Sequence, residues 1–225
     1  MGKTIAIIQS NYIPWKGYFD LIRHADILAI YDSCQYTKND WRNRNLIKTP
    51  DGVKWLTIPV YHNLSMRIDQ VIVKDKKWNI NHWKTIEQFY SHSLYFKEYK
   101  EHIKSLYDNC NYLFLSEINQ YFIRYICQLL GITTQIIDIS QYELTGEKTG
   151  KLVDVCKLLG ADRYVSGPAA QCYLDVELMN KNGISVTWMK YDYPEYKQMY
   201  PPFNHGVSVI DLIFNCGGEA MRYVA

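Results

Sequence analysis

Hydrophobic positions along the chain follow two different spacings, which predict strands and helices in alternation. Residues 5–8 form a continuous hydrophobic run, and in residues 18–22 the hydrophobic side chains recur at helical spacing. A continuous run is typical of a strand buried on both faces, whereas the second spacing is typical of an amphipathic helix. Pro14 and Gly17 break the chain between them. Residues 27–32 return to a hydrophobic run, so the opening predicts two parallel strands joined by a right-handed helical crossover.

The remaining chain continues this alternation with one helical interruption. We expect strands at 55–60, 134–138, 163–165 and 184–189, a hairpin-like excursion at 67–73, and helices at 78–107 (two), 115–130, 152–159, after the turn at 166–175, and from 209 onwards. Gly131 and Gly160 are suited to end the helices before them, and Pro59 places its strand at an edge or near an end. These elements predict an α/β fold with a mainly parallel sheet flanked by helices. We expect one domain, 1–225, with an α-helical insertion at about 78–130.

The composition is that of a folded globular chain. Of 225 residues, 48% are hydrophobic and 21% are charged, and a chain of this length buries about 70% of its unfolded surface. No hydrophobic run approaches the roughly 20 residues of a membrane span, and residues 1–4 show no signal-peptide pattern, so we expect a cytoplasmic protein. The net charge of +2 lacks the electrostatic footprint of a dedicated nucleic-acid binder. The six cysteines contain no C-x-x-C pair, and no metal site is assigned.

The most unusual feature of the composition is its aromatic content. The chain has 20 Tyr and 6 Trp, many of them in polar segments, as on surfaces that stack on sugars or bases. The alternative is that frequent Tyr, Lys and Ile reflect the composition of the genome.

The turn after the first run is the first candidate binding segment. It supplies donors, acceptors, stacking faces and a cation within eight positions, from Gln9, Asn11, Tyr12, Trp15 and Lys16. The carboxyl ends of parallel strands face the ligand crevice of an α/β sheet. The simpler interpretation is that the aromatic rings pack the corner between strand and helix.

Asp32 ends the second hydrophobic run, level with Gln9 at the end of the first. Both side chains would then stand at the ligand side of neighbouring strands. The alternative is that Asp32 caps the next loop or forms an Asx-turn.

The following segment mixes amides, aromatics and cations. Its candidate binding residues are Gln35, Tyr36, Trp41, Arg42, Asn43 and Arg44. Arg42 and Arg44 point the same way if the chain is extended, and guanidinium groups bind phosphate oxygens bidentately, so a diphosphate is the expected guest. A solvated charge run is the alternative.

Further candidates lie later in the chain. They are Ser166, Gly167 and Tyr173 in a turn of small residues, Gln198 in an aromatic loop, and Ser208 and Asp211 at a helix start. Ser208 is equally suited to be an N-cap, with Asp211 in an exchange like that of a capping box. His82 and His205 are candidate acid/base groups, although a histidine on a hydrophobic stripe such as that of His82 is more often a hydrogen-bonded core residue.

Together these motifs resemble the WbqC-like protein family. They are Gln9-x-Asn11-Tyr12-x-Pro14-Trp15-x-Gly17-Tyr18-Phe19, Asp32-x-x-Gln35-Tyr36, Trp41-Arg42-Asn43-Arg44-Asn45, Ser166-Gly167, Tyr173-Leu174 and Ser208-x-x-Asp211-Leu212-x-Phe214-Asn215-x-Gly217. Ser10 departs from the proline expected there in many members. The family is associated with bacterial O-antigen and other surface-polysaccharide gene sets, so the resemblance implies a cytosolic step on a nucleotide-linked sugar.

A weaker resemblance links the opening unit to nucleotidyltransferases, whose sheets are Rossmann-like. Those enzymes carry a histidine pair around the phosphates in this turn, whereas this chain has Trp15, Lys16 and Tyr18. The resemblance implies the fold of the opening unit, whereas the lack of a histidine in this turn argues against the ordinary nucleotidyl-transfer mechanism.

Three functions follow. The first is an enzyme that transfers an acyl or aminoacyl group to the amine of a nucleotide-linked sugar, with Arg42 and Arg44 on the diphosphate and Trp15 or Trp41 stacked on the base or sugar. His82, Asp32 or His205 would take the amine proton. The alternatives are an ATP-dependent nucleotidyl or adenylyl transferase using Mg²⁺, and a non-catalytic binder of sugar nucleotides. The sequence leaves open the donor, the acceptor sugar, any metal requirement and whether the chain forms a homodimer.

Overall fold

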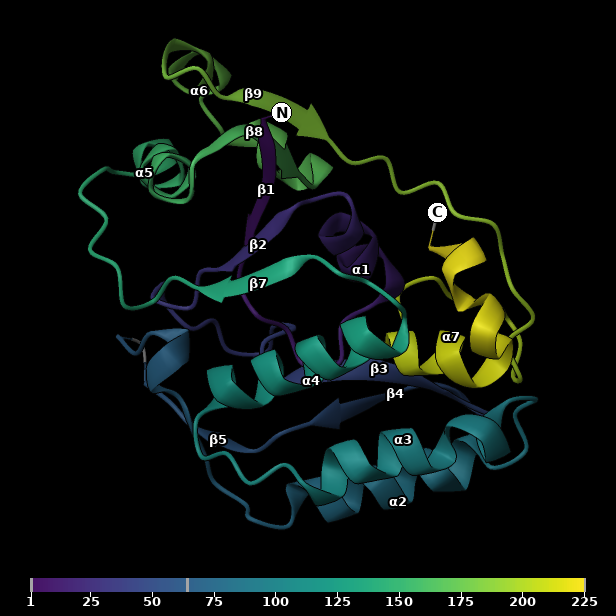
Figure 1. Ribbon diagram of the computed structural model, residues 1–225. Helices are drawn as coiled ribbons and strands as arrows, with labels where there is room; N and C mark the ends of the chain where they lie inside the picture. The colour runs from purple at the N-terminus through teal and green to yellow at the C-terminus, as the bar shows by residue number, and fades with distance from the viewer. Residues whose placement is uncertain (1, 64, 225) are drawn as a thin grey trace.

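The computed structural model describes residues 2–63 and 65–224. Within these residues, five parallel strands form the central sheet (Figure 1). In the order in which they lie side by side, they are β7 (Gln135–Asp138), β2 (Ile27–Ile30), β1 (Lys3–Ile8), β8 (Ala161–Ser166) and β9 (Ser185–Trp188). The predicted α/β fold with a mainly parallel sheet is therefore confirmed.

The strand order reverses between β1 and β8. The chain adds β2 and then β7 on one side of β1, and later adds β8 and then β9 on the other side. Connections leave the carboxyl ends of β1 and β8 in opposite directions, and such a point opens a crevice where α/β proteins bind ligands. The finer Rossmann-like assignment and the number of domains stay predictions.

Different helices cover the two faces of the sheet (Figure 1). On one face, Ala6 and Leu28 belong to a hydrophobic cluster that includes α1 (Lys16–Arg23), α4 (Leu115–Leu129) and α7 (Val209–Cys216). On the other face, Ile5 and Ile27 pack into a second cluster with α5 (Thr149–Leu159) and α6 (Val176–Lys181). Burial on both faces explains the continuous hydrophobic runs of β1 and β2.

A further layer lies below α4 in Figure 1. It contains the antiparallel hairpin of β3 (Arg44–Thr49) and β4 (Gly52–Thr57), the short pair β5 (Val60–Tyr61) and β6 (Ile72–Val73), and the helices α2 (Trp78–Tyr90) and α3 (Phe96–Asp108). The first hydrophobic cluster continues into this layer through Ile47 and Ile86. Helices α2 and α3 confirm the two helices expected at 78–107.

Two local expectations need correction. Residues 44–49 carried no strand signal, yet they form β3 because Ile47 is fully buried while the backbone pairs with β4. The single strand expected at 55–60 is divided, since Pro59 has no N–H for a ladder and Val60 pairs with Val73 instead.

Short helices and helix ends complete the chain. The turn after β8 leads first into a 3-10 helix, η2 (Pro168–Cys172), and further such helices are η1 (Ile68–Gln70) and η3 (Gly217–Tyr223). Gly131 and Gly160 take left-handed backbone angles, φ 70° and 66°, at the ends of α4 and α5, as expected. Among the helices of the described residues, none has the length and hydrophobicity needed to cross a membrane.

Candidate functional site

The turn from β1 to α1 is tightly built around Trp15. Its indole lies against Gly17, where an added Cβ would sit 2.3 Å from a ring carbon, so only glycine fits. The Tyr191 ring lies 5.1 Å from the Trp15 ring, centre to centre. Ile13 adopts φ 36°, a left-handed conformation that strains a β-branched residue. Backbone strain of this kind clusters at functional sites.

Three distant segments meet at this turn. Trp15 forms an isolated antiparallel bridge with Ser208, and the N–H of Val209 donates to the carbonyl of Pro14 at 2.9 Å. The N–H of Ser208 donates to the carbonyl of Leu46 in β3 at 2.8 Å. The opening turn, β3 and the start of α7 therefore hold one another in place.

A cavity of about 320 Å³, here called the tryptophan cavity, lies where these segments meet. It is lined by Asn11, Pro14, Trp15, Trp41, Asn45 and Gly206. Trp41 is 41% exposed, and its ring lies 5.3 Å from that of Trp55, centre to centre. The Arg44 guanidinium lies over the Trp55 indole, 4.2 Å from the centroid of that ring. The cavity thus combines exposed aromatic faces, amides and a neighbouring cation.

Arg42 and Arg44 have different surroundings. Arg42 donates to the side-chain oxygens of both Gln9 and Asn11, which fixes its guanidinium beside the turn. Arg44 donates to the Asn39 carbonyl, while its buried Nε has no partner within the described chain. Asp40 is influenced by both cations: burial alone would raise its pKa, but hydrogen bonds and the two guanidiniums lower it.

Lys16 is buried beneath the loop that precedes α7. Its residue is 2% exposed, and its Nζ donates to the Pro194 carbonyl at 3.3 Å and lies 4.7 Å from the centre of the Tyr193 ring. Burial lowers the pKa of Lys16 to about 8. Within the described residues no carboxylate pairs with the ammonium, which is stabilised by the Pro194 carbonyl and by the faces of Tyr193 and Tyr196.

His205 directly precedes Gly206, which lines the tryptophan cavity, and so lies beside this cavity. Its ring packs edge-on against Phe203 at 4.5 Å, and its Nδ1 is buried without a hydrogen-bond partner among the described residues. Burial, followed by the charge of Lys16, lowers the pKa of His205. A lowered pKa favours the neutral form of the imidazole.

Two other predicted acid/base groups lie in the core. The His82 ring bonds to the Tyr12 hydroxyl at 2.7 Å and to the Thr57 carbonyl at 3.1 Å, and burial lowers its pKa to about 4. Asp32 is fully buried and accepts from the N–H of Ser10 and the hydroxyl of Ser116. Burial raises the pKa of Asp32 although these hydrogen bonds oppose it.

Asp211 does not form the expected capping box with Ser208. Its carboxylate is fully buried and accepts from the hydroxyls of Tyr90 and Tyr196 at 2.9 and 2.7 Å, and from Gln198 at 3.0 Å. Burial raises the pKa of Asp211. Ser208 itself accepts from the N–H of Ile210, so its N-cap role is confirmed.

The other predicted residues divide between structural contacts and a second cavity. Tyr36 donates to Asn43 and Gln35 bridges to Arg67, which braces the segment before β3. Ser166 accepts from Tyr164. An added Cβ on Gly167 would lie 3.2 Å from the hydroxyl of Tyr191, the residue that also contacts Trp15. Gln9 and Tyr173 line a separate cavity at the carboxyl ends of the strands.

Comparison with known proteins agrees with these motifs. The WbqC-like protein family matches residues 9–223, which include the opening turn, the arginine segment and α7. The chain belongs to the WbqC-like protein family. It is 42% identical over 225 residues to the Uncharacterized protein Rv1507c of Mycobacterium tuberculosis, covering 99% of this chain and 97% of the relative. No solved structure matches the chain significantly.

Two contributors to the candidate site were not among the sequence-based candidates. The Trp55 ring lies tilted against that of Trp41 and under the Arg44 guanidinium, and Tyr191 packs on Trp15. Asn45, which belongs to the motif of residues 41–45, lines the tryptophan cavity. The turn at residues 51–52 could have revealed Trp55, because a hairpin folded there brings it opposite Leu46 and next to the arginine segment.

Proposed function

We propose that this WbqC-like protein is an enzyme of bacterial surface-polysaccharide biosynthesis that acts on a nucleotide-linked amino sugar. The reaction we propose is transfer of an acyl or aminoacyl group to the sugar amine. One observation carries this proposal: Trp15 and Trp41 line a single cavity with Asn11 and Asn45, and the Arg44 guanidinium lies over Trp55, the ring next to Trp41. An aromatic face stacks on a sugar ring or a base, amides bond to sugar hydroxyls, and a cation binds phosphate.

Each part of the substrate has a suitable partner near the tryptophan cavity. The exposed Trp41 indole would stack on the base or the sugar ring. The Arg44 guanidinium, which lies over the Trp55 ring, would donate to a phosphate oxygen. Asn11 accepts from Arg42 through its oxygen, so its amide N–H groups are available to sugar hydroxyls. Arg42 would orient Asn11 and Gln9, since it is already bonded to both.

His205 is the residue we assign to proton transfer. In the proposed step the sugar amine attacks the carbonyl carbon of the donor, a C–N bond forms, and the bond to the leaving group breaks. The neutral imidazole takes the proton from the attacking nitrogen and returns it to the leaving group. Burial, followed by the nearby Lys16 charge, lowers the pKa of His205, and this supports the role because it favours the unprotonated imidazole.

The test is incubation of the purified protein with nucleotide-linked amino sugars and a panel of acyl donors, followed by mass spectrometry. We expect a product heavier by the acyl group. His205→Gln should lower turnover by about 10²- to 10⁴-fold, whereas the exposed His92, changed to Gln, serves as the matched control. Pyrophosphate release from ATP without amide formation would instead support the nucleotidyl-transfer alternative. Absence of any product and of any sugar-nucleotide binding would contradict the proposal.

A further inference from the structure

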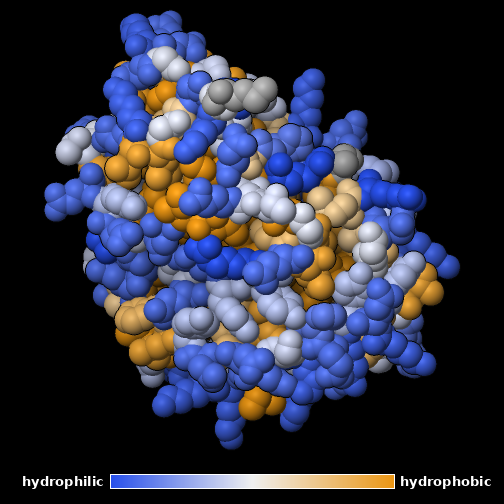
Figure 2. Space-filling view, in the orientation of Figure 1, coloured by the Kyte–Doolittle hydropathy of each residue, from blue (hydrophilic) through white to orange (hydrophobic). Residues whose placement is uncertain are grey.

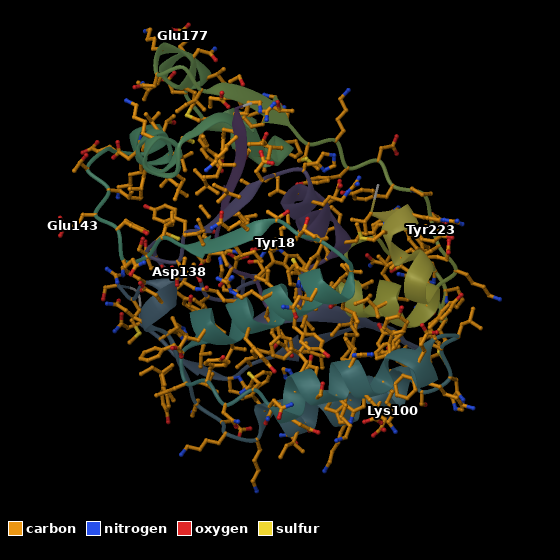
Figure 3. The ribbon with its side chains drawn as sticks, in the orientation of Figure 1. Tyr18, Lys100, Asp138, Glu143, Glu177 and Tyr223 are labelled. Carbon is orange, nitrogen blue, oxygen red and sulfur yellow. The ribbon has the colours of Figure 1, made fainter. Side chains whose placement is uncertain are left out.

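A second and larger cavity, here called the strand-end cavity, lies at the carboxyl edge of the sheet. Its volume is about 510 Å³, within the range of about 300–1,000 Å³ that ligand sites occupy. Gln9 follows β1, Tyr31 follows β2, Tyr164 belongs to β8, and Thr149 begins α5. Asp138, labelled in Figure 3, marks the carboxyl end of β7 and so this edge of the sheet. The cavity therefore adjoins the point between β1 and β8 where the strand order reverses.

The lining of this cavity is aromatic and carries a single charge. Three tyrosines contribute to it, Tyr31, Tyr164 and Tyr173, and Lys148 is the one charged side chain among the lining residues. Tyr173 is 69% exposed, so most of its ring faces solvent, where packing gives it little reason to be aromatic. Figure 2 shows further hydrophobic atoms gathered on the surface between α5 and β7. Such a lining suits a planar ring that carries a negatively charged group.

Polar groups of the cavity are placed to receive that negative group. The Thr149 hydroxyl accepts the Asp175 N–H at 3.0 Å, which leaves its own hydrogen free to donate. Lys148 precedes it and has φ 47°, an uncommon conformation for a residue with a side chain. The N–H groups of Gly150 and Lys151 are already bonded to the carbonyls of Glu147 and Lys148, so an anion would depend on the Lys148 ammonium and the Thr149 hydroxyl.

We infer that the strand-end cavity is a second ligand site that binds a nucleoside phosphate, with the base against Tyr173 and the phosphate at Lys148 and Thr149. This site is separate from the tryptophan cavity, and its occupation does not depend on the proposed sugar-nucleotide reaction. The two are nevertheless connected through Arg42, which donates to Gln9 of one cavity and to Asn11 of the other. If the proposed reaction is correct, a ligand in this second cavity lies beside the first substrate.

Calorimetric titration of the full chain with ADP, and separately with inorganic phosphate, tests this inference. We expect ADP to bind, and Tyr173→Ala and Lys148→Ala each to weaken ADP binding about tenfold or more, since a stacked base and a charge-assisted contact are lost. Tyr61→Ala and Lys181→Ala, which change exposed residues that do not line this cavity, are the matched controls and should bind ADP as the wild type does. Both test residues are exposed, so their replacement should leave the fold intact.

The outcomes separate this inference from the proposed function. The ADP binding that Tyr173→Ala weakens should persist in Trp41→Ala, because Trp41 lines the other cavity. Loss of ADP binding in Trp41→Ala, with full binding in Tyr173→Ala, would place the nucleotide in the tryptophan cavity and overturn the inference. Failure of ADP to bind at millimolar concentration would overturn it even if acyl transfer is observed. If inorganic phosphate binds as tightly as ADP, the cavity binds anions without recognising the nucleoside, and the inference that it is a nucleoside phosphate site is overturned.

Discussion

Single residues at the opening turn show how narrowly the site is built. Gly17 is needed because the Trp15 indole occupies the place of a side chain, and Trp15 in turn lines the tryptophan cavity. The sequence pattern marked Pro14 and Gly17 as chain breakers, which is a local property of these residue types. The burial of Lys16 could not be foreseen, because the aromatic rings that surround it lie almost 180 positions later, at Tyr193 and Tyr196.

Replacement of Gly17 tests the contact with Trp15. Gly17→Ala should lower the free energy of unfolding by about 1–3 kcal/mol, because the new Cβ forces the indole or the backbone to move. Urea denaturation measures the change. Gly150→Ala is the matched control, since an added Cβ there meets nothing within 4 Å and the residue lies in the first turn of α5. Equal stability of Gly17→Ala and Gly150→Ala would show that the Trp15 ring moves aside without cost.

The buried His82 predicts a pH dependence of stability. Its pKa is lowered from 6.5 to about 4 in the folded protein, so between these pH values the unfolded chain binds a proton that the folded one does not. The His82 contribution to stability should thus be complete above pH 6.5, fall as the pH drops to about 4, and then level off. The difference in unfolding free energy between the wild type and His82→Gln, measured from pH 7 to 4, should shrink accordingly. A pH-independent difference would contradict this.

Helices and strands could be predicted from the sequence where the hydrophobic spacing of their own residues indicates them. The helices α2 and α3 follow from hydrophobic spacing alone, and their ends lie close to the expected positions. The strand β3 could not be predicted in that way, because only its pairing with β4 and the burial of Ile47 make it a strand. The same pairing brings Trp55 to Arg44. The part of the site that sequence reasoning missed is therefore the part created by a non-local antiparallel contact.

Helix α4 holds the opening turn in position through two polar side chains. Ser116 donates to the buried carboxylate of Asp32, and Asn119 donates to Ser10 and to the Arg42 carbonyl at 3.1 and 2.8 Å. Ser116→Ala should lower the unfolding free energy by about 1–3 kcal/mol, because the Asp32 carboxylate loses a buried donor. Thermal or urea denaturation checks this. Ser105→Ala in α3 removes a hydroxyl that bonds only within its own helix and should change stability little. Similar values for both variants would argue that Asp32 is satisfied without α4.

At the scale of the whole molecule, the fold class follows from the alternation of strands and helices, but the arrangement of the site does not. Local patterns contain no information on the order β7–β2–β1–β8–β9, which depends on contacts between distant segments. That order places Gln9 and Tyr173 at one cavity, and Asn11, Trp15 and Trp41 at another. The neighbouring candidates Gln9 and Asn11 thus line different cavities, and the Arg42 side chain bonds to both.

The tryptophan cavity is the centre of this account, and ligand binding there tests it most directly. The measurement is calorimetric titration of the wild type, Trp41→Ala and the exposed control Tyr61→Ala with a panel of UDP- and dTDP-linked amino sugars. We predict that at least one sugar nucleotide binds the wild type and Tyr61→Ala alike, and that Trp41→Ala weakens its binding about tenfold or more, because a stacking face is removed. Undiminished binding by Trp41→Ala, or no binding by the wild type at millimolar concentration, would contradict the account.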